Sequence, residues 1–216
     1  MTVKVAAVQI SPVLYSRAGT VERREEDPRA GKQGVEFAVF PETVIPYCPY
    51  FGFVKAPYAL IADGEQIHAA MFPGGLGSEK FAPQMEVAIR QHALESACFV
   101  VNATAWLDDD QKAKLVEDNG VPVGLFSHGF FTAIVDPEGR IVGEPLAAGE
   151  GEVIADRDFT MIDRRKRMAD TRGHYARPEL LSLQVDRMPT APLHERGTAV
   201  AAQATRVDEK RSTAAQ

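Results

Sequence analysis

The sequence predicts an α/β fold built on short buried strands. Residues 35–40 form an apolar run rich in valine and phenylalanine, which is typical of a central strand buried on both faces in a parallel sheet. Residues 3–10 are similarly apolar and β-branched, which predicts a first strand. Residues 79–96 repeat apolar side chains at helical spacing and so predict a helix whose apolar stripe packs on a sheet.

The remaining elements follow from the same patterns. We expect strands at 67–72 and 98–103, a polar helix after the acids at 108–110, a hairpin at 130–145, a strand at 152–156 and a short basic helix at 161–169. A solvated face is the default interpretation of the charges on the basic helix. The segment at 23–31 has no apolar stripe and contains the helix-breaking Pro28, so it conflicts with the helix expected there.

One carboxylate directly follows the strand at 35–40. Pro41 cannot donate to a strand ladder and is expected to end that strand, and Glu42 comes next. Open α/β sheets place their ligand crevice at the carboxyl ends of the strands, which makes Glu42 a candidate functional residue. The alternative is an ordinary solvated loop acid, because Asp and Glu are mostly exposed.

Composition and charge limit the classes of function. The 216 residues are 45% hydrophobic and 25% charged, which is ordinary for a soluble globular domain. A net charge of −6 and a pI near 5.4 argue against a nucleic-acid partner, because neutralising phosphates needs a basic face. No apolar run approaches the roughly 18 residues of a membrane span, and no signal peptide is expected. Two cysteines without Cys-x-x-Cys spacing suit a reducing cytoplasm.

The histidines give no metal-site pattern. The five residues are His68, His92, His128, His174 and His194. They are widely spaced, none belongs to a His-x-x-x-His pair, and neither cysteine has metal-ligand spacing. The sequence therefore predicts no metal site.

Five segments together resemble the nitrilase branch of the carbon-nitrogen hydrolases. They are the strand at 3–10, Phe-Pro-Glu at 40–42, Gly-Glu-Gln-Ile-His at 64–68, Phe-Val-Val-Asn-Ala-Thr-Ala-Trp at 99–106 and Arg-Pro-Glu-Leu-Leu-Ser-Leu at 177–183. The resemblance extends from the first strand almost to the tail. It implies the family's two-sheet α-β-β-α sandwich and hydrolysis of a small-molecule nitrile to a carboxylic acid and ammonia, with no metal and no organic cofactor.

In that family a glutamate, a lysine and a cysteine work together. The thiolate attacks the nitrile carbon, the glutamate moves protons and the lysine stabilises the charged intermediate. By resemblance Glu42 is the general base, but no residue of this chain matches the lysine or the cysteine. Sequence typical of the region after the glutamate passes at once to sequence typical of the region after the cysteine. We therefore predict an internal deletion near 57/58.

Cys48 is the candidate for a substitute nucleophile, because it follows Glu42 by six residues. A nucleophilic thiol needs a lowered pKa and a close partner. Lys55 is the one cation nearby in the sequence, and a neighbouring carboxylate raises a thiol pKa, so these surroundings argue against the role. Cys98 lies in an apolar run without a neighbouring cation and is expected to be an inert core thiol.

Two residues at the end of the strand at 98–103 are candidates for lining a substrate pocket. They are Asn102 and Trp106, which come near the presumed crevice. Packing is the equally weighted alternative for Trp106, because tryptophan often anchors a core.

These observations define the expected organisation. We expect one domain over residues 1–196 that forms an incomplete α-β-β-α sandwich, and a disordered tail over 197–216. The resemblance implies a C-terminal arm, from about residue 157, that crosses onto a partner subunit of a homo-oligomer. A strand at 35–40 that has lost its neighbours would become an exposed apolar edge. Two functions stay open: a nitrile hydrolase with Glu42 as base, and a non-catalytic remnant that associates through its arm, which we favour for this polypeptide.

Overall fold

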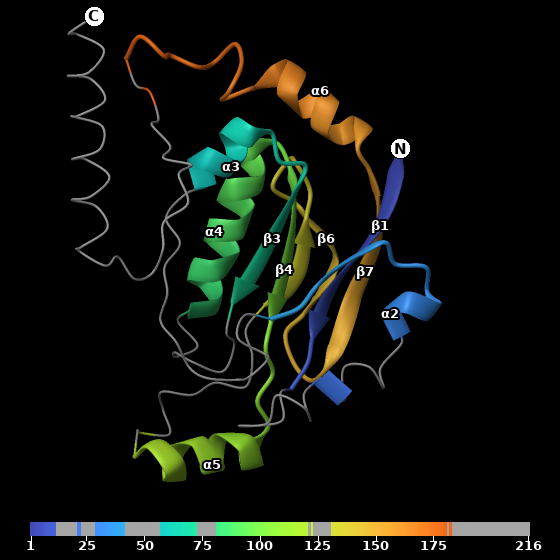
Figure 1. The fold of residues 1–216 in the computed structure, drawn as a ribbon, viewed down its shortest axis with the longest axis vertical. Coiled ribbons are helices and arrows are strands. Elements are labelled where there is room, and N and C mark those ends of the chain that lie inside the picture. Colours follow the sequence, from blue (N-terminus) through green and yellow to red (C-terminus); the bar gives the residue numbers. More distant parts are fainter. Residues whose placement is uncertain are drawn as a thin grey trace, which may run out of the picture. The chain divides into compact units, whose positions relative to one another are not determined.

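The computed structural model describes residues 1–11, 21–22, 29–41, 57–72, 81–120, 122, 131–180 and 182. The contacts divide the chain into one unit at Met1–Leu183 and a second at Gln184–Gln216, and the described elements belong to the first. In chain order they are β1 Thr2–Gln9, α2 Arg29–Lys32, β2 Phe37–Val39, α3 Pro57–Asp63, β3 Ile67–Phe72, α4 Phe81–Ser96, β4 Phe99–Thr104, α5 Asp109–Asn119, β5 Thr132–Val135, β6 Ile141–Leu146, β7 Gly151–Asp158 and α6 Thr160–Met168 (Figure 1).

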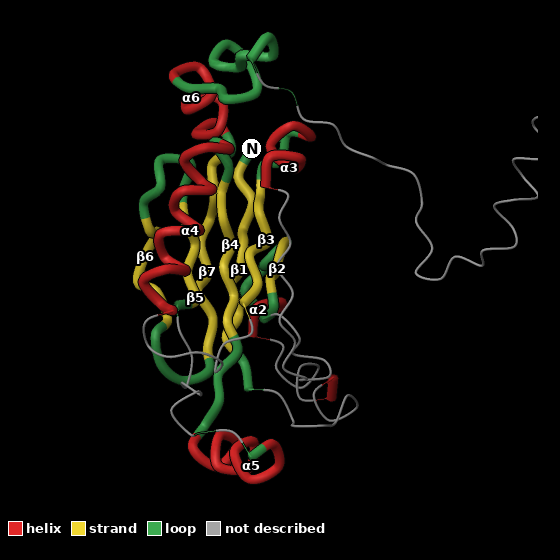
Figure 2. Tube along the Cα trace, turned by 90° about the vertical axis from the view of Figure 1, so that its left-hand side faces the viewer, coloured by secondary structure: helices red, strands yellow, loops and turns green. Residues whose placement is uncertain are grey.

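The described strands form two mixed sheets. The first has the order β2-β1-β7, in which β1 is parallel to β2 and antiparallel to β7. The second has the order β3-β4-β5-β6, in which β3 and β4 are parallel and the remaining pairs are antiparallel. The two sheets lie against each other, with α4 outside the second sheet and α2 outside the first (Figures 1 and 2). The fold is the expected α/β fold of α-β-β-α type.

The core lies between the two sheets. Side chains of β1, β2 and β7 pack there against side chains of β4 and β5; the buried members are Val3, Val5, Ala7, Val39, Val101, Ala103, Ile134 and Val153. The alternate residues of β1 form a second cluster on the other face, which contains Ala6, Val8 and Ile10. Successive side chains of a strand point to opposite faces, so β1 is buried on both, as its continuous apolar sequence predicts.

Helix α4 covers the second sheet. Met85, Ile89 and Ala93 recur every four residues and are buried, because residues at this spacing share one face of a helix. Ile89 and Ala93 belong to a cluster with Val100 of β4 and Val135 of β5. The helix at 79–96 and the strand at 98–103 are therefore confirmed by α4 and β4 within the described residues.

Strand β2 corrects one expectation and confirms another. The segment at 35–40 is not a central strand buried on both faces: β2 is only Phe37–Val39, and Phe37 is 36% exposed. Among the described strands only β1 pairs with it, so β2 is an edge of the first sheet. The exposed edge expected for a strand that lacks neighbours is confirmed. The tail at 197–216 lies outside the described residues.

Helix α5 and the hairpin turn are each fixed by local side-chain contacts. Asp108 caps α5: its carboxylate accepts from the backbone N of Gln111, and the Gln111 side chain accepts from the backbone N of Asp108. In the turn between β5 and β6, Asp136 Oδ1 accepts from the backbone N of Glu138 at 2.9 Å and of Arg140 at 3.0 Å. No helix in the described part of the chain is long and apolar enough to cross a membrane.

The hairpin turn is also a contact point for α4. Arg90 Nε donates to the carbonyl O of Gly139 at 2.9 Å, and the Leu94 side chain lies over the same glycine. Gly139 has a φ of +73°, and a Cβ placed on it would lie 2.8 Å from Leu94 Cγ. Glycine is therefore needed here both for its backbone conformation and for its lack of a side chain.

We predict that Gly139→Ala lowers the free energy of unfolding by about 2 to 3 kcal/mol, from the left-handed backbone and from overpacking against Leu94. Gly143→Ala is the matched control, because Gly143 has a φ of +71° and nothing within 4 Å of its added Cβ. It should cost only about 1 to 2 kcal/mol. Urea unfolding of both variants measures the difference. Equal losses of unfolding free energy would mean that the contact with Leu94 does not affect stability.

Candidate functional site

The carboxyl ends of several strands meet at one end of the two sheets. The backbone N of Trp106, just after β4, donates to the carbonyl O of Ile10, just after β1, at 3.3 Å. β2 runs parallel to β1, and β3 runs parallel to β4, so their carboxyl ends lie at the same end (Figure 1). This is the edge at which open α/β sheets bind ligands.

In the sequence, Glu42 comes directly after the part of the chain that lies at this edge. Val39 ends β2 in the core, and the buried Pro41 is the last described residue before Glu42. Glu42 and Cys48 themselves lie outside the described residues. Their roles as general base and substitute nucleophile therefore stay predictions.

A buried polar network joins the two sheets at this same end. The side chain of Gln9, the last residue of β1, donates through Nε2 to the carbonyl O of Gly149 at 2.6 Å. Its Oε1 accepts from the hydroxyls of Thr104 at 2.9 Å and Thr132 at 2.8 Å. Thr132 Oγ1 also accepts from the backbone N of Thr104 at 3.0 Å. The network fixes the end of β1 against the ends of β4 and β5.

We predict that Gln9→Leu lowers the free energy of unfolding by about 1 to 3 kcal/mol, because the buried hydroxyls of Thr104 and Thr132 lose their shared acceptor. Gln33→Leu is the matched control: Gln33 is exposed and its amide contacts Glu152 at 3.0 Å on the surface. It should change stability by less than about 0.5 kcal/mol. Urea unfolding measures both variants, and a Gln9→Leu loss no larger than the control would contradict the role of the network.

Asn102 and Trp106 occupy different environments. Asn102 is fully buried, and its Nδ2 donates to the carbonyl O of Phe131 and contacts Met85 Sδ at 3.6 Å. These contacts place its side chain on the face of β4 that α4 covers. Trp106 is half-buried and lies at the edge formed by the carboxyl ends of β1 to β4, which we call the strand-end edge. A pocket role for these two residues stays a prediction.

Cys98 is the buried core thiol that the sequence predicts. It immediately precedes β4, is fully buried and lies 2.9 Å from Ser96 Oγ. Burial raises the pKa of the Cys98 thiol to about 12. The nucleophilic form of cysteine is the thiolate, so this residue is unreactive in the folded protein near neutral pH.

We predict that iodoacetamide leaves Cys98 unmodified in the native protein at pH 8.5, and modifies it in urea, where the pKa of an exposed cysteine is about 8.5. The raised pKa keeps the thiol protonated as the pH rises from about 8.5 toward about 12. Peptide mass spectrometry measures the modification at each pH. Comparable labelling of Cys98 in the native and urea-unfolded protein would contradict the assignment.

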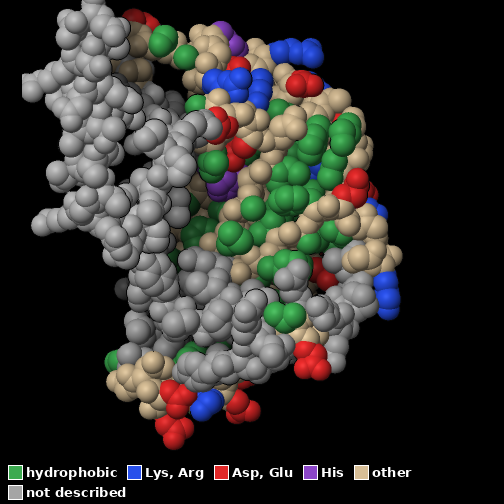
Figure 3. Space-filling view, viewed as in Figure 1, with side chains coloured by type: hydrophobic (Ala, Val, Ile, Leu, Met, Phe, Trp, Pro, Cys, Tyr) green, Lys and Arg blue, Asp and Glu red, His purple; other side chains and the backbone are tan. Residues whose placement is uncertain are grey.

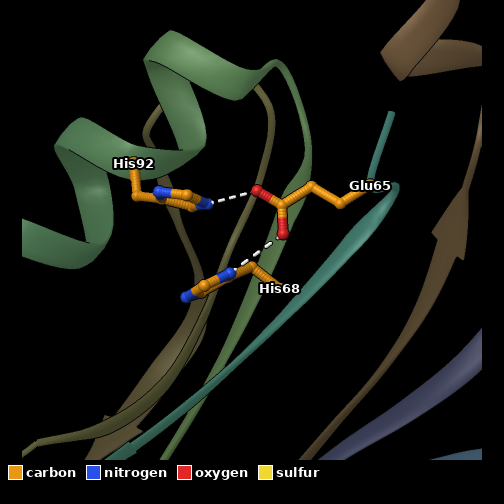
Figure 4. Close-up of side chains that lie close together, drawn as sticks. All are labelled: Glu65, His68 and His92. Atoms are coloured by element: carbon orange, nitrogen blue, oxygen red, sulfur yellow. Dashed lines mark hydrogen bonds and ion pairs between the residues drawn. The ribbon is translucent and has the colours of Figure 1, made fainter. Parts of the chain in front are cut away.

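The structure also brings together three residues that sequence reasoning missed. Glu65 lies in the turn before β3, His68 in β3 and His92 on α4 (Figure 4). Glu65 Oε2 is 3.0 Å from His68 Nδ1, and Glu65 Oε1 is 2.5 Å from His92 Nε2. The two imidazole rings have centroids 3.9 Å apart. A usable signal existed, because His92 follows Ile89 by three residues and so lies near the helix face that packs on the sheet.

This cluster is at the amino end of β3, opposite the edge where Glu42 follows β2. Burial by itself would raise the pKa of Glu65, but the hydrogen bonds and charges of His68 and His92 outweigh it and lower the pKa to about 2. The carboxylate is therefore charged throughout the neutral range. A cavity of about 380 Å³ lies next to it, lined in part by Gly64 and Arg172.

Comparisons with known proteins decide the family. Residues 48–167 match the carbon-nitrogen hydrolase family. The chain is 40% identical to Nitrilase 3 of an unknown prokaryotic organism over 307 residues, which cover 90% of this chain and 93% of that protein. The chain belongs to the nitrilase branch of the carbon-nitrogen hydrolases. It is 52% identical over 138 residues to a nitrilase of Paraburkholderia phymatum, and this match covers 64% of the chain and only 40% of that nitrilase.

Solved structures agree with the fold of this nitrilase-branch chain. An amidase from Nesterenkonia aligns with a TM-score of 0.55 at 13% identity, over 77% of this chain and 95% of the amidase. Nit3 of Saccharomyces cerevisiae aligns with a TM-score of 0.57 at 11% identity, over 81% of this chain and 96% of Nit3. Identities this low support the α-β-β-α fold alone.

Proposed function

We propose that this chain descends from a nitrilase that converts a small nitrile to a carboxylic acid and ammonia, and that the chain by itself does not catalyse this reaction. The general base of the ancestral reaction is Glu42. The lysine and cysteine of the family have no counterpart in these residues, which fits the predicted deletion near 57/58. The ancestor was an enzyme, and the present polypeptide is a non-catalytic remnant of it.

The length of the alignment with Nitrilase 3 carries this proposal. It extends over 307 positions, which exceeds the 216 residues of the chain by 91. Because 90% of this chain is aligned, about 194 of its residues take part, so about 113 positions of the relative face gaps within this chain, while 93% of the relative's length is still spanned. We propose that these positions form one interval near 57/58, which at this size would hold several βαβ pieces of about 30 residues each.

The described residues offer no replacement thiol at the strand-end edge. The reaction of this family needs a thiolate to attack the nitrile carbon, after which water is added and ammonia leaves. Cys98 precedes the first residue of β4, and six residues of strand span about 20 Å, so its sulfur lies near the wrong end of the sheet. Its raised pKa also keeps it protonated. Glu42 is a carboxylate and cannot supply the thiolate that this reaction needs.

Association through the C-terminal arm is the function that we propose for the remnant. Large apolar side chains gather in the segment from the end of α6 onward, where Met168, Tyr175 and Leu180 are each 62–73% exposed. A groove of about 650 Å³ between β6 and β7 is lined by both apolar and charged residues. Figure 3 shows hydrophobic side chains on the opposite edge of the two sheets, where β2 and β3 lie. Apolar surface of this kind favours contact with another protein. These features support a homo-oligomer, or assembly with full-length relatives.

We also propose a domain organisation and a cellular location for this chain. One domain over 1–196 carries the arm from about residue 157, and the buried, reduced Cys98 fits a cytoplasmic protein. Neither nucleic acid nor membrane is a proposed partner.

We predict that purified protein releases no ammonia from a panel of small aliphatic and aromatic nitriles, because the thiol and the ammonium needed beside Glu42 are missing. A colorimetric ammonia assay measures the release, and the Cys48→Ala variant is assayed beside the wild type. Ammonia release by the wild type that disappears in Cys48→Ala would overturn the proposal and make Cys48 the nucleophile. Release that persists in the variant would also overturn it.

We predict that the wild type elutes with a mass at least twice the 23.6 kDa of one chain, and that Met168→Glu together with Leu180→Glu shifts it to one chain. Two charges placed in an apolar contact are desolvated without partners, which weakens association. Val87→Glu is the control, because Val87 is 68% exposed but lies on α4, outside the arm. Light scattering after gel filtration gives the masses, and a monomeric wild type or an unchanged double variant would contradict the role of the arm.

A further inference from the structure

We propose that Glu65, His68 and His92 form a binding site for one divalent transition-metal ion of the zinc class. The site contains two imidazole nitrogens and one carboxylate, and it includes neither Glu42 nor any residue of the nitrile-hydrolysis reaction. It joins three elements: the turn before β3, β3 itself and α4 (Figure 4).

The donor atoms already converge. One ligand atom from each residue lies within 4.8 Å of the other two. His68 Nδ1 and His92 Nε2 face different oxygens of the same carboxylate, at 3.0 and 2.5 Å. Donors bound to one tetrahedral zinc ion at about 2.0 to 2.2 Å are roughly 3.4 Å from each other. The two nitrogen–oxygen separations are shorter than this value by about 0.4 and 0.9 Å, so side-chain adjustments of about 1 Å would admit an ion.

The donor types select the class of ion. Imidazole together with carboxylate suits Zn²⁺ and the neighbouring ions Co²⁺, Ni²⁺ and Cu²⁺. Ca²⁺ needs six to eight oxygen ligands, and Mg²⁺ also prefers oxygen, so two of the three donors here are wrong for them. Cys98 lies close to the cluster, but its thiol is in contact with Ser96 and does not belong to the group of converging ligand atoms, so we do not count it as a ligand. Water completes the coordination.

The surroundings restrict access without closing the site. The exposed fractions of the side chains are 11% for Glu65, 23% for His68 and 10% for His92. A site this sheltered holds its ligands in place, because the side chains have few alternative positions, and His68 leaves a route to solvent. Lys166, Arg172, Asp63 and Asp170 line the neighbouring cavity, and their two positive and two negative charges leave no excess field against a cation.

Binding replaces hydrogens with the ion. In the metal-free protein, hydrogens between the ring nitrogens and the carboxylate form the contacts with Glu65. When M²⁺ binds, the nitrogens His68 Nδ1 and His92 Nε2 must lose those hydrogens and donate their lone pairs to the metal. From an imidazolium ring this hydrogen leaves to solvent as a proton, and the ring keeps the hydrogen on its other nitrogen. A neutral ring changes tautomer instead: the coordinating nitrogen gives its proton to solvent and the other nitrogen takes one up, so the ring stays neutral. No oxidation or reduction is involved.

The structural consequence is a link between segments far apart in sequence. His92 is 24 residues after His68, with the end of β3 and most of α4 between them. An ion held by both would fix α4 to the amino end of β3. This end of the sheet is opposite the carboxyl ends of the parallel strands. Because the ion binds only the folded arrangement, it would stabilise that arrangement by mass action.

The test uses full-length protein stripped of metal with EDTA and then titrated with ZnCl₂ in a calorimeter. We expect saturation at one Zn²⁺ per chain, and a rise in the thermal unfolding midpoint with Zn²⁺ but not with Mg²⁺. Glu65→Gln and His92→Gln should weaken binding at least tenfold, because each removes one of three ligands. His174→Gln is the matched control: that histidine is exposed and contacts Tyr175, with ring centroids 4.8 Å apart.

Co²⁺ gives an independent readout, because its visible absorption reports the ligands around the ion. The wild type and His174→Gln should give the same spectrum, and His68→Gln, at the most exposed of the three positions, should lose it while remaining folded by circular dichroism. Absence of saturable Zn²⁺ binding to the wild type would overturn the proposal. Wild-type affinity in folded His68→Gln or Glu65→Gln would overturn it as well. Since no readout measures nitrile hydrolysis, these outcomes are separate from those of the ammonia assay.

Discussion

The hydrogen bonds of the buried Gln9 side chain hold together the end of the fold on which the candidate active site depends. Its amide is shared among Thr104, Thr132 and Gly149, which belong to β4, β5 and the segment before β7. Apolar contacts between sheets are non-directional, whereas a buried amide with satisfied partners allows one alignment only. The network therefore sets how the end of β1 meets the end of β4. The position of β2 follows from the pairing of β2 with β1.

The two ends of the sheets differ in chemistry. The strand-end edge carries neutral polar groups and leads to Glu42, whereas the opposite end of the second sheet carries the charged cluster of Glu65, His68 and His92. Burying a charged carboxylate is unfavourable unless it is paired. The half-buried position of Glu65 therefore depends on its contacts with His68 and His92. Helix α4 contributes one of them, so its docking on the sheet has a polar component beside its apolar face.

Several features could be derived from sequence because they depend on local pattern. The apolar run of β1, the spacing of Met85, Ile89 and Ala93 in α4, and the Asp136 turn each lie within a few residues. The family was also accessible, since its motifs are contiguous. The central position expected for the strand at 35–40 was wrong, because a strand's neighbours depend on which other strands the chain supplies, and here only β1 pairs with β2 among the described strands.

The sequence by itself determined helix α4, most of the strands, the membership of the nitrilase branch and the buried state of Cys98, because periodicity, motif and apolar context are properties of contiguous residues. Tertiary structure alone decided that Gln9 would meet Thr132, 123 residues away, and that Glu65 would meet His92, 27 residues away. Neither pair has a local spacing that identifies it. Their contacts exist because two sheets and a helix pack in one arrangement, and that arrangement brings together side chains that the order of the chain keeps apart.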